Sequence, residues 1–328
     1  MGSPFLSPPT SIPPARALQL SQQAPIILRQ NTSSLPTSLP FSLLSNESQD
    51  DWTIFENLLL SCLRTRDDES ARQCLEKLCA RFGDSNERVM GLKGMYEEAV
   101  AENDTALEAI LDDYEDVLEK DPTNASISKR RIALLRSMGR PNEAISALVE
   151  HLDASPTDAE AWSELSDLYF SQSMFAQSIF SLEEVLLIVP NAWNIHARLG
   201  EITYASALSI SSNQTAVAEN ERGPLTDCVR SFSRSIELCD DYLRGYYGLK
   251  LSTSRLLNLK PSSSTAPART SIAPRELEKL NELATSKLAT IVRKSSAGEK
   301  GWTGYDRGEV IAARELLDRL NLGAKVVF

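Results

Sequence analysis

The sequence predicts an all-α solenoid of stacked helical hairpins that ends in a pair of C-terminal capping helices. Pro122, Pro156 and Pro190 follow one another at intervals of 34 residues. Apolar side chains at three- and four-residue steps accompany them, and such steps return to one side of a helix. A single pair of helices cannot bury its apolar faces alone, so neighbouring pairs must stack to form a continuous core.

The stretch "SPTDAEAWSELSDLYFSQ" (155–172) opens the clearest repeat unit. Trp162, Leu165 and Tyr169 share one face of its first helix. The second helix has small or apolar residues at the matching positions, namely Ser178, Leu182 and Val185. Pro190 ends this helix, because proline cannot continue the hydrogen-bond ladder. A 34-residue period with this pattern is that of tetratricopeptide repeats.

Weaker units begin at Trp52, Asn86, Ala125 and Trp193. The unit at Asn86 fits only with five residues added between its helices. The unit at Trp193 needs a 16-residue insertion, "SISSNQTAVAENERGP" (209–224), which we expect to form a loop. A further first-type helix follows, with Tyr246 and Leu249 in place. About five and a half units therefore make up a right-handed superhelix over residues 51–258.

The regions outside the repeats differ in composition. Residues 1–50 hold eight of the sixteen prolines and no acidic residue before Glu47, which predicts an extended or disordered arm. Residues 259–273 form a Ser-, Ala- and Pro-rich linker. We expect residues 274–328 to cap the solenoid with helices near 274–295 and 307–320, because the end of a stack needs a polar outer face.

Composition excludes several classes of protein. The net charge of −11 argues against a nucleic-acid-binding protein, which needs a cationic surface. The sequence contains no run of about 18 apolar residues, so no transmembrane helix is predicted. The five cysteines form no CxxC pair, and without a secretory signal they indicate a reducing compartment, where we expect them to be small core residues.

The sequence contains no persuasive catalytic, metal-binding or cofactor-binding motif. His151 and His196, the only histidines, occupy positions that face the packing between helices. The acidic stretch 107–121 spreads its carboxylates around one helix, as a solvated face does. We therefore expect a binding protein with no cofactor and no small-molecule substrate, not an enzyme.

The basic stretch "SKRRIALLRSMGR" (128–140) has two compatible interpretations. Arg131 takes a position that is usually buried, where its head can pair with the acidic helix before it. Alternatively, the stretch is a basic patch for an acidic partner, because Lys129 and Arg136 lie seven residues apart on the inner side of a first helix. We expect the concave face to bind an acidic or amphipathic segment of a partner protein, with the aromatic residues supplying more of the affinity than the exposed charges. The predicted partner-binding residues are Lys129, Arg136, Ser163, Asp167, Phe170 and Tyr204.

Several pieces of the chain carry a family resemblance. They are "GMYEEAV" (94–100), "DPTNASISKRRIAL" (121–134), "EAWSELSDLYF" (160–170), "SLEEVLLIVPN" (181–191), "FSRSIEL" (232–238) and "RGYYGLKLS" (244–252). In this combination the sequence resembles subunit 2 of the ER membrane protein complex, from about Trp52 to Leu257. The Pro- and Ser-rich start and the linker at 259–273 depart from that family.

The resemblance implies a non-catalytic scaffold on the cytosolic face of the endoplasmic reticulum. In that family the repeats hold cytosolic parts of membrane subunits, and the complex inserts tail-anchored and multi-pass proteins. The implied partners are membrane and cytosolic subunits of the complex, through which the chain would associate peripherally with the membrane.

Two other functions compete with this one. A chaperone adaptor of the repeat class would clamp a carboxylate with Lys, Arg and Asn on successive first helices. The inward positions here are mixed, since they include Glu160, Asp167 and Glu201, and this argues against such a clamp. An enzyme that uses the repeats for docking would need a nucleophile and a base, and no such pair can be named.

Overall fold

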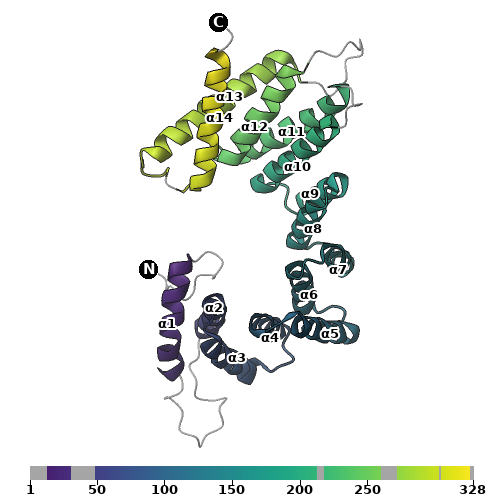
Figure 1. The fold of residues 1–328 in the computed structure, drawn as a ribbon, viewed down its shortest axis with the longest axis vertical. Helices are drawn as coiled ribbons and strands as arrows, with labels where there is room; N and C mark the ends of the chain where they lie inside the picture. The colour runs from purple at the N-terminus through teal and green to yellow at the C-terminus, as the bar shows by residue number, and fades with distance from the viewer. Residues whose placement is uncertain (1–12, 31–48, 213–217, 260–271, 303, 326–328) are drawn as a thin grey trace, which may run out of the picture. The chain divides into compact units, whose positions relative to one another are not determined.

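The computed structural model describes residues 13–30, 49–212, 218–259, 272–302 and 304–325. Within these ranges every regular element is an α-helix, fourteen in all (Figure 1). The predicted all-α fold of helical hairpins is therefore confirmed. No helix in the described ranges is both long and apolar enough to cross a membrane.

The chain forms two compact units, Met1–Ala154 and Ser155–Phe328. The first unit contains α1 (Pro14–Gln30), α2 (Gln49–Thr65), α3 (Asp68–Phe82), α4 (Glu87–Val100), α5 (Asp104–Lys120), α6 (Ala125–Ser137) and α7 (Pro141–Ala154). The second contains α8 (Ala159–Ser171), α9 (Phe175–Ile188), α10 (Trp193–Ser212), α11 (Ala218–Leu238), α12 (Leu243–Asn258), α13 (Pro274–Ser296) and α14 (Arg307–Lys325). The division into 51–258, 259–273 and 274–328 stays a prediction.

In the first unit, side chains cap successive helices. Asp67, Asn86, Asn103 and Asn124 each accept a hydrogen bond from a backbone N–H in the first turn of the helix that follows. These N–H groups have no partner within the helix, so the caps fix where α3, α4, α5 and α6 begin.

The prediction of an extended arm over residues 1–50 is wrong for Pro14–Gln30, which form α1. Proline at the first helical position is tolerated, because its missing N–H would have no helical partner there. Four apolar residues at three- and four-residue steps are buried, and α1 packs against α2 and α3. They are Ala17, Leu20, Ala24 and Leu28. Residues 1–12 and 31–48 of the predicted arm lie outside the described residues.

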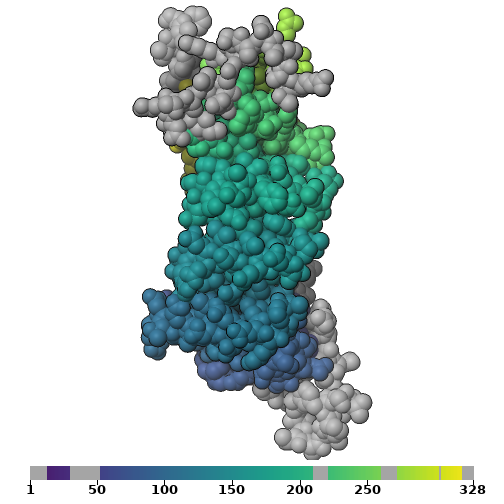
Figure 2. Space-filling model, turned by 90° about the vertical axis from the view of Figure 1, so that its right-hand side faces the viewer, coloured from purple at the N-terminus to yellow at the C-terminus, as the bar shows by residue number. Residues whose placement is uncertain are grey.

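The second unit is a stack in which each helix packs against its sequence neighbours, and its colours follow the chain in order (Figure 2). Small residues let the helices approach closely. The buried hydroxyls of Ser166 and Ser178 each donate to the backbone carbonyl of the other residue, at 2.9 and 2.8 Å, which locks α8 to α9. The ring of Phe232 lies against the backbones of Gly200 in α10 and Gly248 in α12.

The loop expected at 209–224 is largely helix. The helix α10 continues to Ser212 and α11 begins at Ala218, so only residues 213–217 lie outside the described part of the insertion. The physical reason is the pairing of buried Glu221 with Arg255 of α12 at 3.0 Å, which anchors the first turn of α11. Leu225 is then fully buried in the core of the unit.

The two predicted C-terminal helices are present. Residues 274–296 form α13, and α14 begins at Arg307 as expected but runs five residues beyond the predicted end at 320. The helix α13 packs along α12, and α14 packs on α13. Tyr305, just before α14, donates its hydroxyl to the carbonyl of Asp241 at 3.0 Å. Residues 260–271 of the predicted linker lie outside the described residues.

Candidate partner-binding surface

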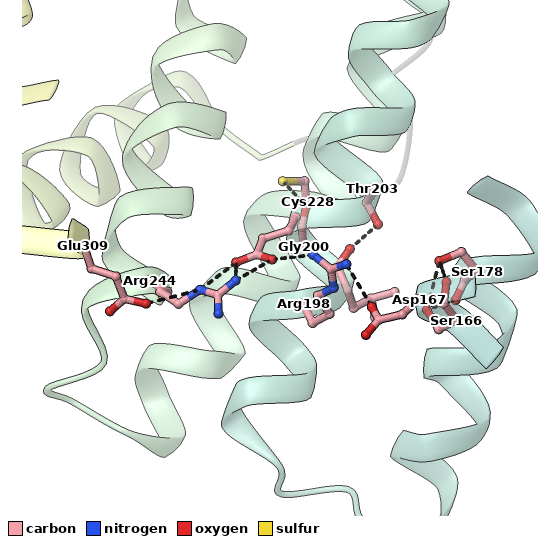
Figure 3. Close-up of polar contacts among 11 residues, drawn as sticks. Ser166, Asp167, Ser178, Arg198, Gly200, Thr203, Cys228, Arg244 and Glu309 are labelled. Atoms are coloured by element: carbon pink, nitrogen blue, oxygen red, sulfur yellow. Dashed lines mark hydrogen bonds and ion pairs between the residues drawn. The ribbon is translucent and has the colours of Figure 1, made fainter. Parts of the chain in front are cut away.

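Ion pairs connect four helices of the second unit in one line (Figure 3). We call Asp167, Arg198, Glu201, Arg244 and Glu309 the charged row. Arg198 of α10 pairs with Asp167 of α8 at 2.9 Å and with Glu201 one turn along at 3.0 Å. Arg244 of α12 reaches Glu201 at 2.7 Å and Glu309 of α14 at 3.8 Å.

Both guanidiniums of the charged row are paired with carboxylates of the same row. Burial lowers the pKa of Arg244, but the carboxylates of Glu201 and Glu309 more than offset this, so its pKa lies above the ordinary value. Each partly exposed pair contributes only about 0–1 kcal/mol. The ion pairs therefore link α8, α10, α12 and α14 without adding much stability. A row of three carboxylates and two guanidiniums offers no surplus positive charge to an acidic ligand.

Phe170 belongs to the same surface. The guanidinium carbon of Arg198 lies 4.9 Å from the centre of the Phe170 ring, a cation–π contact. The ring also meets Phe175 edge to face, with centroids 6.0 Å apart. It packs against the core formed by Leu182, Val185 and Ile202. Phe170 and Asp167 are thus brought together through Arg198.

Tyr204 and Ser163 flank the charged row on α10 and α8. Tyr204 lies one turn beyond Glu201, half-buried against the core that α10 to α14 form. Burial raises the pKa of its phenol, and the nearby cation of Arg255 partly opposes this. Ser163 is half-buried one turn before Asp167. Four of the six predicted residues therefore lie on α8 and α10.

Lys129 and Arg136 lie on α6 of the first unit, and both are exposed. The adjacent arginines of the basic stretch are engaged within that unit. Arg131 pairs with Glu115 of α5 at 3.0 Å and with Glu150 of α7 at 3.1 Å. The interpretation that Arg131 pairs with the acidic helix before it is therefore confirmed.

Arg130 and Arg140 cross-link the same unit. Arg130 binds Glu98 of α4, which also accepts the buried Tyr114 hydroxyl at 2.7 Å. Arg140 reaches Glu108 of α5 at 3.0 Å. Much of the basic stretch thus serves packing between α4, α5, α6 and α7. Binding of a partner by Lys129, Arg136 and the four residues of the second unit stays a prediction.

Sequence reasoning missed Arg198, Arg244 and Glu309 and did not assign Glu201 to the site. The signal was an alternation of charge along successive first helices, from Asp167 through Arg198 and Glu201 to Arg244. The insertion at 209–224 spaces Glu201 and Arg244 by more than one period, which hides the alternation.

The groups that could support chemistry have structural roles. His151 is buried and lies 3.1 Å from the Ser128 hydroxyl. His196 lies 3.0 Å from the carbonyl of Pro190. Burial raises the pKa of the three buried cysteine thiols to about 12, which leaves them without nucleophilic thiolate at neutral pH; they are Cys62, Cys74 and Cys228. The described residues bring no three metal-ligating side chains together.

Comparison with known proteins identifies the family. The family model for the EMC2 TPR-like repeat domain matches residues 85–216. The TPR repeat protein oca3 of Schizosaccharomyces pombe is 33% identical over 219 residues, which are 67% of this chain and 72% of that protein. ER membrane protein complex subunit 2-A of Xenopus laevis is 30% identical over 67% of this chain and 68% of its own length.

A more distant relative agrees with these two. ER membrane protein complex subunit 2 of Saccharomyces cerevisiae is 26% identical over 72% of this chain and 77% of its own length. A TPR-like repeat is a protein-interaction fold, so the family supports the prediction of a non-catalytic protein. With similarity that spans two thirds of both chains, this protein belongs to the ER membrane protein complex subunit 2 family.

Proposed function

We propose that this chain is a scaffold subunit of the ER membrane protein complex. The observation that carries the proposal is the similarity to named subunits of that complex over two thirds of the chain. The stacked hairpins support it, because such stacks present long surfaces to other proteins. The charged row adds a surface on which ion pairs link four helices.

The scaffold acts by holding cytosolic parts of membrane subunits, and in this way it supports the insertion of tail-anchored and multi-pass membrane proteins. It associates peripherally, on the cytoplasmic side, through partner proteins. Because the charged row is internally neutralised, Phe170 and Tyr204 contribute more to partner affinity than the charged residues beside them.

Affinity purification of the tagged full chain in mild detergent, with its partners identified, tests the proposal. We expect membrane proteins of the endoplasmic reticulum to co-purify. Recovery of cytosolic chaperones without membrane proteins would instead support a chaperone adaptor. In fractionation, the chain should sediment with ER membranes and be released by alkali without detergent. A chain that needs detergent for release contradicts peripheral association.

The predicted inner-face site has its own test. The double variant Phe170→Ala, Tyr204→Ala should co-purify less membrane partner, with its helical circular dichroism retained. Both rings are half-buried, so the melting temperature must be measured alongside. Phe82→Ala, which removes an exposed ring from α3, is the control. Full partner recovery with the double variant would place the interface elsewhere on the chain.

A further inference from the structure

The outer face of α9 exposes two large apolar side chains. Phe180 is 54% exposed and Leu187 is 76% exposed. They lie seven residues apart, which is about two turns and roughly 10 Å along the helix. The opposite face of α9 is buried through Leu182 and Val185. Packing within the second unit therefore leaves about half of Phe180 and most of Leu187 uncovered.

Two carboxylates flank these apolar residues. Glu183 and Glu184 follow Phe180 by three and four residues, so they fall on either side of the line from Phe180 to Leu187. Among the residues that the structure describes, neither carboxylate has an ion-pair partner, whereas those of the charged row are all paired. We call Phe180, Glu183, Glu184 and Leu187 the α9 stripe.

The α9 stripe has a fixed anchor. The edge of the Phe180 ring packs against Trp162 of α8, with centroids 6.1 Å apart and planes at 80°. Trp162 is itself held, because its indole N–H donates to the carbonyl of Pro156 at 2.9 Å. A side chain that is already immobilised loses little rotamer entropy when a partner covers it.

We propose that the α9 stripe docks a basic amphipathic helix from the cytosolic flank of a membrane-spanning partner, an inference that rests on the proposed function. A helix in such a contact presents apolar anchors spaced up to seven residues apart on one face. Lysine and arginine beside those anchors would neutralise Glu183 and Glu184. Cytoplasmic segments next to membrane spans carry an excess of these residues. An anionic lipid surface has the wrong sign for two free carboxylates.

Site-specific cross-linking in the intact complex tests this inference. A photo-reactive phenylalanine derivative replaces Gln177, which is exposed one turn before Phe180 and outside the α9 stripe. The full chain is purified in mild detergent, illuminated, and the adduct is sequenced. We expect an adduct with a segment of a membrane protein in which Lys and Arg outnumber Asp and Glu. An acidic or neutral segment, a lipid adduct, or no adduct would overturn the inference.

Charge reversal supplies the second arm. Glu183→Lys with Glu184→Lys should lower the yield of the adduct about tenfold, since two attractions become repulsions. Glu278→Lys with Glu282→Lys makes the same change on exposed positions of α13 and should leave the yield unchanged. Equal yields from the two double variants would also overturn the inference.

The two proposals fail in different ways. If membrane proteins co-purify but no basic segment cross-links at position 177, the α9 stripe is not the docking site and the proposed function stands. If no ER membrane protein co-purifies at all, the proposed function fails and the inference fails with it.

Discussion

Gly248→Ala should destabilise the second unit, although alanine favours helix. Gly248 lies within α12, where its backbone meets the ring of Phe232 from α11. A Cβ at this position would lie 2.5 Å from Cε2 of that ring and closer still to Cζ and Cε1. Non-bonded carbons prefer separations of about 3.5–4.0 Å, so the ring or the helix must move.

The expected size follows from two opposing effects. Replacing glycine by alanine inside a helix stabilises by about 1 kcal/mol. Overpacking a buried site costs about 1–3 kcal/mol. The ring of Phe232 is 1% exposed and also touches Gly200, so it has little room to retreat and the cost lies at the upper end. We expect a net loss of about 2 kcal/mol of unfolding free energy.

Urea unfolding followed by circular dichroism measures this loss, and two further glycines calibrate it. A Cβ at Gly200 would lie 2.9 Å from the Phe232 ring, and one at Gly91 would lie 3.3 Å from Cβ of Ser126. All three glycines are helical, so the gain in propensity is shared and the differences report the clash. The losses should rank Gly248→Ala, Gly200→Ala, Gly91→Ala. A more stable Gly248→Ala protein would refute the reasoning.

Three other substitutions test separate parts of the structure by the same measurement. Leu165→Ala, at a side chain 2% exposed, should cost about 2–5 kcal/mol, and a loss under about 0.5 would contradict its core position. Tyr114→Phe removes the hydrogen bond to Glu98 and should cost about 1 kcal/mol. Lys287 holds the pKa of the Asp240 carboxyl below its ordinary 3.8. This pair therefore stabilises above pH 3.8 and fades as the pH falls through the folded-state pKa, so Asp240→Asn should destabilise only at higher pH.

The repeat period predicts those parts of the fold in which consensus positions meet the core. Leu165, Leu182 and Val185 are buried, as their places in the period require. The period says nothing of α1, which precedes the first repeat, at Trp52. The prediction for residues 1–50 rested on their prolines and missing acids and did not use the apolar steps at Ala17, Leu20, Ala24 and Leu28. Those steps make a helix only because α2 and α3 supply a surface for them.

The site was less predictable because it depends on pairing between helices. The sequence alone does not show which residue pairs with Asp167. Its contact with Arg198 forms because α8 and α10 lie close together. The aromatic ring of Phe170 predicts a contact with a partner, and in the structure the ring also contacts the guanidinium of Arg198. No period encodes such pairs, since each depends on side-chain lengths and on the distance between two helices.

The α9 stripe shows why an apolar pattern can conceal a surface. The helix α9 reads "FAQSIFSLEEVLLI", so apolar residues occur all round it, and an apolar residue in a repeat is normally assigned to the core. Leu182 and Val185 satisfy that assignment, but Leu187 is 76% exposed. Hydrophobic residues that are left uncovered by packing within the unit form an exposed patch. Such patches mark contacts with other molecules. The free carboxylates of Glu183 and Glu184 beside this patch then select the charge of the partner.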